Sequence, residues 1–167
     1  MMENWNHSNN NKNQKTVSNW YRENILPIIT KVDRNVLELS EAYFFKNLRF
    51  MLRDKVSEDE IHTSLNITES LLDLSSKRVV DTINNVYLSI YNQANFRIHE
   101  GDGKLSAIYD TIVTNTTIYL SEVYETFHNL EKSTSILETQ SGINNFLDKT
   151  KNIPEILEFE AIAILFK

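Results

Sequence analysis

The sequence predicts an all-α protein with a single domain. Glycine and proline are scarce, with 3 and 2 among 167 residues, whereas a sheet-rich chain of this length needs many more turn residues. Apolar residues recur three and four positions apart through most of the chain, which is the period of an amphipathic helix. One core suits a chain of this length, and no linker or internal repeat divides the sequence.

The first helix is expected after a polar tail. Residues 1–15 are rich in Asn, Ser and Lys and show no periodicity, which predicts a disordered tail before a domain of residues 16–167. A helix over 16–32 follows, and Pro27 should kink or restart it. The next helix covers 35–56 on an apolar stripe of Leu37, Phe44, Leu48, Met51 and Leu52, bordered by Tyr43 and Phe45.

The middle of the chain carries two helix starts. Ser57–Glu60 has the pattern of a capping box, and Asn66–Glu69 offers a similar start. The helical period that follows extends to His99, which would make about 50 Å of helix at 1.5 Å per residue. A compact domain of this size does not accommodate that length, so we expect a break near Ser75 or Asn84.

The last third of the chain is also helical by its period. A stripe that begins at Leu105 continues to Leu137, and Gly142 is expected to end that helix. A short helical turn follows over 143–147. Pro154 suits the first position of a last helix, although residues 161–166 are apolar enough to form an edge strand instead.

The segment 95–110 has the composition of a site, because it holds two of the three glycines beside a histidine, a glutamate and an aspartate. We interpret it as a corner between two helices. Gly101 and Gly103 permit positive φ, and Asp102 can cap the second helix. His99 would then lie in the last turn of the first helix. The alternative is a cation-binding or acid–base site.

Charge and composition exclude several classes of function. Lys and Arg number 17 against 23 for Asp and Glu, a net charge of -6, which disfavours nucleic acid as a partner. The chain has no cysteine, its four histidines fit no zinc pattern, and the glycine-rich loops of nucleotide sites are absent. We expect a protein that is not an enzyme and holds no metal. The start lacks the apolar core of a signal peptide and no segment indicates a membrane span, so we expect a cytoplasmic protein.

Polar residues inside apolar stripes indicate a binding site, because an unpaired polar group is costly to bury. Such residues occur on one face of the helix predicted before segment 95–110 and on the stripe of the helix after it. A pocket between these two helices would have an apolar wall, hydroxyl groups and one cation, which suits an amphiphilic anion. The predicted ligand-binding residues are Arg97, Ser76, Tyr87, Tyr91 and Thr116. Alternatively, Thr116 bonds to its own helix and Arg97 extends to solvent.

A second apolar surface predicts self-association. Leu74, Leu88 and Phe96 point away from the main stripe of their helix, and a face of this kind can be buried against another subunit of a homodimer. The chain would then be a helical protein–protein interaction module, a homodimeric regulator without a small-molecule ligand. That reading is the alternative to ligand binding.

Three segments, NWYRENILPIITKV, LSEAYFFKNLRFMLRDKV and RVVDTINNVYLSIYNQANFRIH, resemble the globin-type sensor domains of bacterial signalling proteins. The resemblance covers residues 17–132 and is greatest to the stand-alone, non-heme members that inhibit sporulation in endospore formers. The amino-terminal domains of stressosome regulators are similar at a greater distance. The resemblance implies a globin-like fold without heme, since no histidine stands in the middle of residues 66–98, where heme-binding members carry the proximal ligand.

The same resemblance implies a ligand and a role. The ligand would be a fatty acid in a hydrophobic tunnel, together with a small anion such as chloride. With no output module, such a protein would sequester the signal of a sporulation sensor histidine kinase and inhibit sporulation by competition.

Overall fold

The structure is a computed structural model that describes residues 12, 14–72, 77–92 and 98–166, with the backbone path alone at 77 and 98–102. Within these residues every regular element is a helix and no strand occurs. The predicted all-α class and single domain are therefore confirmed. The helices are η1 (Tyr21–Ile25, a π-helical turn), α2 (Leu26–Arg53), α3 (Glu58–Ser70), α4 (Lys77–Tyr91), α5 (Ile98–Lys132), α6 (Ile136–Thr150) and α7 (Ile153–Leu165).

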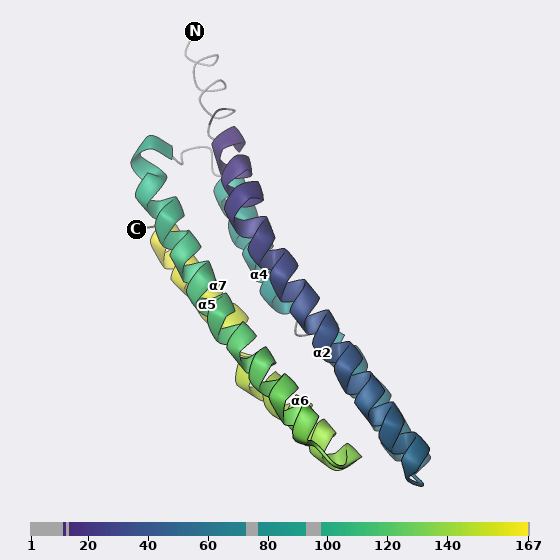
Figure 1. The fold of residues 1–167 in the computed structure, drawn as a ribbon. Helices are drawn as coiled ribbons and strands as arrows, with labels where there is room; N and C mark the ends of the chain where they lie inside the picture. The colour runs from purple at the N-terminus through teal and green to yellow at the C-terminus, as the bar shows by residue number, and fades with distance from the viewer. Residues whose placement is uncertain (1–11, 13, 73–76, 93–97, 167) are drawn as a thin grey trace.

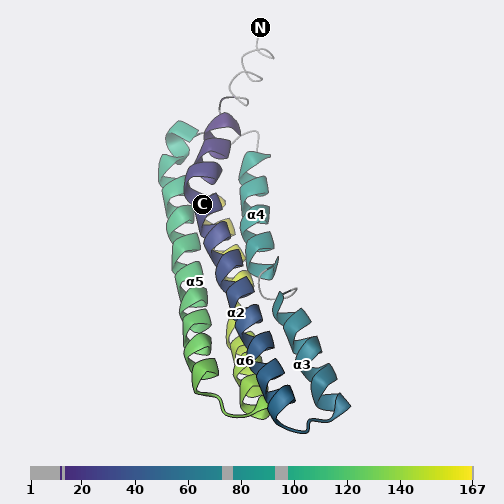
Figure 2. The ribbon, with the colours of Figure 1, turned by 45° about the vertical axis from the view of Figure 1, so that its right-hand side comes forward.

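The helices form four rods that run up and down along one long axis (Figures 1 and 2). The first rod is a continuous helix from residue 14 through η1 and α2, and the third is α5. α3 and α4 make the second rod, while α6 and α7 make the fourth. Each return path therefore consists of two shorter helices, and the alternating directions are those of an up-and-down bundle.

Each rod packs mainly against two others, and α2 of the first rod also contacts α6 of the fourth. α2 lies against α3 and α4 on one side and against α5 on the other, and α6 and α7 close the bundle against the second and third rods. α4 and α5 therefore stand at opposite corners, with α2 and α7 between them (Figure 2). Buried side chains from all four rods fill the interior, the largest being Tyr43, Tyr119 and Phe146.

The globin-like arrangement implied by the resemblance finds no support in this geometry. Globin helices pack pairwise at about 50° around a central pocket. Here the helices lie along a common axis, and the interior is a continuous core of interleaved side chains (Figure 1). The three segments therefore resemble globin-type sensor domains in their helical sequence pattern and not in how the helices are arranged.

Pro27 does not divide the first rod. The Leu26 N–H donates to the Tyr21 carbonyl, five residues earlier, so that the helix widens by one π-helical turn just before the proline and then continues. A proline ring clashes with the carbonyl four residues before it, and a wider turn relieves that clash. The two helices predicted over 16–32 and 35–56 are thus one helix. Its described part extends back to residue 14, inside the predicted tail, of which residues 1–11 and 13 lie outside the described residues.

This continuity places the predicted stripe of 35–56 on the outside. The stripe that faces the core continues from the start of the rod through Val32, Val36, Leu39, Tyr43 and Phe50, all of which are buried. By contrast Leu37, Phe44, Leu48 and Leu52 are exposed. Both sets have helical spacing. The inner set is the one that lies on the same side of the helix as the buried residues in the first turns of the rod.

The middle of the chain agrees in part with the prediction. Ser57 caps α3 by accepting from the Glu60 N–H at 3.2 Å, as the capping box predicts. Asn66–Glu69 starts no helix and lies inside α3. Of the two positions where we expect a break, Asn84 is inside α4, so the helix is not broken there, and Ser75 lies outside the described residues.

Gly101 and Gly103 do not form the predicted corner. Both lie within α5, which already begins at Ile98, so His99 stands in the first turn of α5 and Asp102 is not its cap. None of the described glycines has a positive φ. Glycine permits a corner without requiring one, because its cost inside a helix is only about 1 kcal/mol.

The end of the chain differs from the prediction in the same way. α5 ends at Lys132, and Gly142 lies inside α6 rather than at a helix end. Pro154 stands in the first turn of α7, as predicted. Residues 161–165 continue that helix, so the alternative of an edge strand is wrong.

The glycines inside helices give a first prediction. A Cβ added at Gly103 or at Gly142 would meet no atom within 4 Å. Gly103→Ala and Gly142→Ala should each raise the free energy of unfolding by about 0.5–1 kcal/mol, because alanine loses less conformational entropy on folding. Urea denaturation followed by circular dichroism measures the change. A loss of stability in Gly103→Ala would instead support the predicted corner.

Candidate functional site

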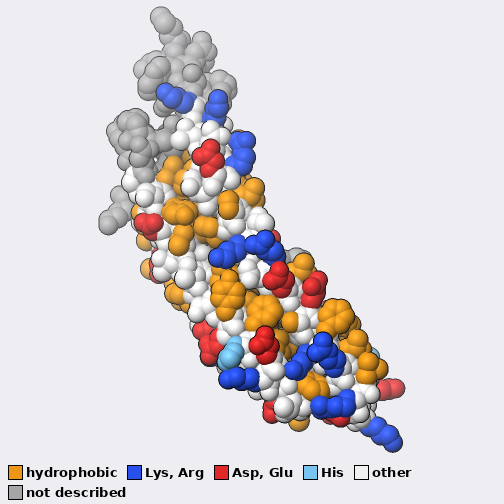
Figure 3. Space-filling model, viewed as in Figure 1, with side chains coloured by type: hydrophobic (Ala, Val, Ile, Leu, Met, Phe, Trp, Pro, Cys, Tyr) orange, Lys and Arg blue, Asp and Glu red, His pale blue; other side chains and the backbone are white. Residues whose placement is uncertain are grey.

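The outer side of α2 carries a stripe of exposed apolar side chains with charged residues among them, which we call the α2 face (Figure 3). It consists of large side chains that are between 38% and 80% exposed, namely Leu37, Phe44, Phe45, Leu48 and Leu52 of α2 with Leu65 of α3. The rings of Phe44 and Phe45 meet edge to face, with centroids 5.5 Å apart. Figure 3 shows hydrophobic side chains, interspersed with Lys and Arg, over the half of α2 remote from the N-terminus.

A buried polar cluster lies directly beneath this face and joins three helices. The Thr139 hydroxyl of α6 hydrogen-bonds to Asn47 Oδ1 of α2, and Gln140 Nε2 of α6 donates to Ser64 Oγ of α3 at 3.0 Å. Tyr43 lies beside Asn47 and Ser64. Burial raises the pKa of Tyr43, and the contacts with Ser64 and Asn47 oppose that rise. The phenol therefore stays protonated at neutral pH.

A small cavity separates the polar cluster from the α2 face. Its volume is about 40 Å³, and its walls come from α2 and α3: Phe44, Asn47, Leu48, Met51, Ile61, Ser64, Leu65 and Thr68. Asn47 is 2% exposed, and its Nδ2 has no hydrogen-bond partner among the described residues. A space of this size accommodates a single water molecule, which can satisfy such a donor.

A second cavity lies where α4 begins and where α6 is followed by α7. It has a volume of about 170 Å³ and is lined by Arg78, Val79, Tyr119, Leu147, Thr150, Lys151 and Pro154. The walls are mainly apolar, while Arg78 and Lys151 supply positive charge from exposed positions. Lys151 already forms an ion pair with Asp148 at 2.9 Å. This cavity has the chemistry expected of the predicted pocket, built from other residues.

The structure does not bring the predicted ligand-binding residues together. Tyr87 and Tyr91 form an aromatic cluster with Tyr21, whose ring centroid is 4.2 Å from that of Tyr87. Thr116 donates to the carbonyl of Ile112 at 2.7 Å, which is the alternative weighed for it. Their helices, α4 and α5, stand at opposite corners. The remaining two residues, Arg97 and Ser76, lie outside the described residues.

The predicted dimer interface is described at one position. Leu88 is 47% exposed on α4, as expected, but Leu74 and Phe96 lie outside the described residues. Leu88 is therefore a suitable control position for substitutions on the larger α2 face.

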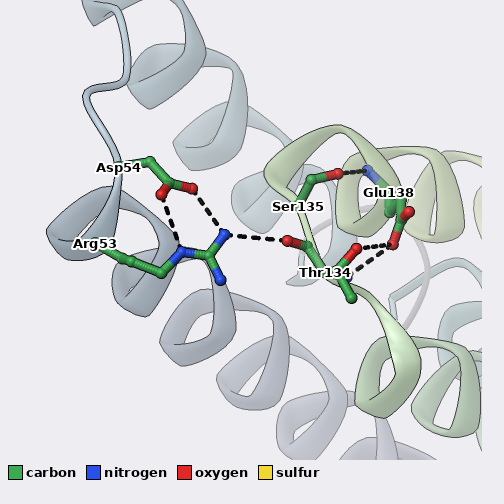
Figure 4. Close-up of polar contacts among 5 residues, drawn as sticks. All are labelled: Arg53, Asp54, Thr134, Ser135 and Glu138. Atoms are coloured by element: carbon green, nitrogen blue, oxygen red, sulfur yellow. Dashed lines mark hydrogen bonds and ion pairs between the residues drawn. The ribbon is translucent and has the colours of Figure 1, made fainter.

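Sequence reasoning missed the contact that joins the ends of the rods (Figure 4). Ser135 caps α6 by accepting from the Glu138 N–H at 3.2 Å, and the Glu138 carboxylate accepts from the Thr134 N–H at 2.7 Å. Arg53, paired with Asp54, donates to the Thr134 carbonyl at 3.1 Å. The Ser-x-x-Glu spacing of a capping box was a readable signal for this helix start.

Comparisons with family models, with curated protein sequences and with solved structures give no match. In the described part of the chain, no helix is long and apolar enough to cross a membrane. Nor do three or more histidine or acidic side chains gather in a metal-binding group among those residues.

The polar cluster gives a second prediction. Thr139→Val leaves Asn47 Oδ1 buried without its donor and should lower the free energy of unfolding by about 1–3 kcal/mol. Thr126→Val is the matched control, since that buried hydroxyl bonds to the Glu122 carbonyl of its own helix. The loss should shrink when Asn47→Leu is combined with Thr139→Val. Equal losses in Thr139→Val and Thr126→Val, measured by urea denaturation, would show that the bond between helices contributes nothing.

Proposed function

We propose that this protein is a helical interaction module that forms a homodimer through its α2 face. The observation that carries the proposal is the second apolar stripe of α2, which no other part of the described chain covers. Isolated exposed apolar side chains are ordinary on protein surfaces, whereas larger groups of them mark interaction sites. The proposal concerns binding rather than catalysis.

The size of the α2 face supports a second copy as its occupant. If a fully exposed large side chain presents roughly 200 Å², the six residues of the face leave about 600 Å² of apolar surface in water. That is near the upper end of the patches found on monomers. A stable interface buries about 800 Å² on each partner, so the face with its polar rim is large enough for one.

The charges around the apolar surfaces distinguish α2 from α7. α7 also exposes Ile156, Phe159 and Ile162. The charged residues of α7 itself are all acidic, however, so two copies meeting along this helix would bring like charges together. The α2 face has both signs, with Glu41 among its apolar residues and Arg49 beside them. A self-complementary contact needs both signs.

Sedimentation equilibrium at several concentrations tests the proposal. The unmodified protein should be dimeric, and Phe45→Asp should make it monomeric, because a carboxylate at the centre of the face cannot be buried unpaired. Leu88→Asp is the matched control, since Leu88 is 47% exposed and Phe45 54%. It should leave the dimer intact. A monomeric unmodified protein, or equal effects of the two substitutions, would refute the assignment.

A second candidate function is the binding of a small amphiphilic anion in the cavity of about 170 Å³. Its apolar walls, the hydroxyl of Thr150 and the charges of Arg78 and Lys151 support such a ligand. A cavity of this volume suits a molecule near the size of benzene, which favours a short-chain carboxylate over a long fatty acid. Sequestering the signal of a sporulation sensor kinase would be a further step, and it rests on the resemblance of the three segments alone.

Titration with sodium hexanoate, followed by amide chemical shifts in NMR spectra, tests this candidate. Saturable shifts are expected around the cavity. Arg78→Glu combined with Lys151→Glu should weaken binding at least about tenfold, because like charge then opposes the carboxylate. Lys149→Glu, outside the cavity lining, is the control and should bind as before. Shifts that fail to saturate, or that hexanol produces equally, would count against an anion site.

A further inference from the structure

We infer that the two copies of the proposed dimer pair antiparallel along α2, with the two-fold axis at Phe45. The inference rests on the proposed function, since it assumes that the α2 face meets a second copy. It adds the direction and the register of the contact, which decide what each side chain faces and how long the assembly is.

The two outermost leucines of the α2 face lie at nearly equal distances along α2 from Phe45. Leu37 lies eight residues before it and Leu52 seven residues after it. Leu37 is 50% exposed and Leu52 80%. In an antiparallel pair centred on Phe45, Leu52 of one copy comes opposite the turn that holds Leu37 in the other. Each end of the contact thus buries one leucine from each copy, as a two-fold interface requires.

The two charged residues nearest Phe45 on the outer side of α2 have opposite signs, and this difference favours antiparallel over parallel pairing. Glu41 and Arg49 each lie four residues from Phe45, a rotation of about 40° around the helix. Both are exposed. In the antiparallel pair, Glu41 of each copy faces Arg49 of the other, so two ion pairs flank the centre. In a parallel pair, Glu41 would face Glu41 and Arg49 would face Arg49, and like charges across an interface are repulsive.

The position of the face along the rod fixes the shape of the dimer. Phe45 lies eight residues before the end of α2, far along the first rod from residue 14. Antiparallel pairing at that end therefore sets the two bundles end over end. At 1.5 Å per residue, residue 14 of one copy lies about 90 Å from residue 14 of the other, whereas a parallel pair would hold them side by side.

Single cysteines test the direction, because the chain has none of its own. Phe45→Cys should cross-link to itself under mild oxidation. Glu38→Cys and Leu52→Cys should cross-link poorly alone and efficiently when the two variants are mixed, since position 38 faces position 52 only in the antiparallel register. Leu88→Cys controls for chance collisions. Self-linking of Glu38→Cys and Leu52→Cys above that control would overturn the antiparallel direction.

Charge reversal tests the register independently. Glu41→Arg and Arg49→Glu should each weaken the dimer at least about tenfold in sedimentation equilibrium, because each creates two like-charge contacts. The double variant with both substitutions should recover the original affinity. A dimer that is indifferent to all three variants would overturn the register while leaving the proposed function in place. A monomer throughout would overturn both.

Discussion

The length of the first rod is the constraint on which the rest of the bundle depends. From residue 14 to the end of α2 the chain makes one helix of about 60 Å. Its inner stripe is apolar over nearly that whole length and must be covered. α5 covers it with a single helix of 35 residues. The two return paths cover the remaining length with two helices each, which is why the bundle is long and thin (Figure 2).

The buried polar cluster limits how those rods slide against one another. Apolar side chains would pack in several registers at similar cost, whereas the bonds from Thr139 to Asn47 and from Gln140 to Ser64 form in one register only. Buried polar groups are costly unless they are paired, so a shifted register would leave several of them unsatisfied. The cluster is also the floor under the α2 face, and it holds α2 and α3 in the relative position on which the face depends.

Much of the secondary structure could be predicted from the sequence, because helical periodicity and capping are local properties. The cap at Ser57 and the helix begun near Pro154 both follow from such signals. The arrangement could not be predicted in this way. α2 carries two apolar stripes, and only one of them continues the apolar positions of the first turns of the rod. The sequence prediction divided the rod near Pro27, so it could not use that continuity to choose the inner stripe. The predicted pocket between α4 and α5 assumed that helices adjacent in sequence are adjacent in space, whereas the described parts of these two helices stand at opposite corners.

The break between α6 and α7 has a mechanical consequence. Arg78 lies in the first turn of α4, and Lys151 lies between α6 and α7, yet both line one cavity. The start of α4 and the break between α6 and α7 therefore occur at the same level of the bundle. At that level α2 and α5 are unbroken helices, and the cavity leaves the space between the rods incompletely filled. We expect the bundle to resist bending least there, because the fourth rod is not continuous at that level.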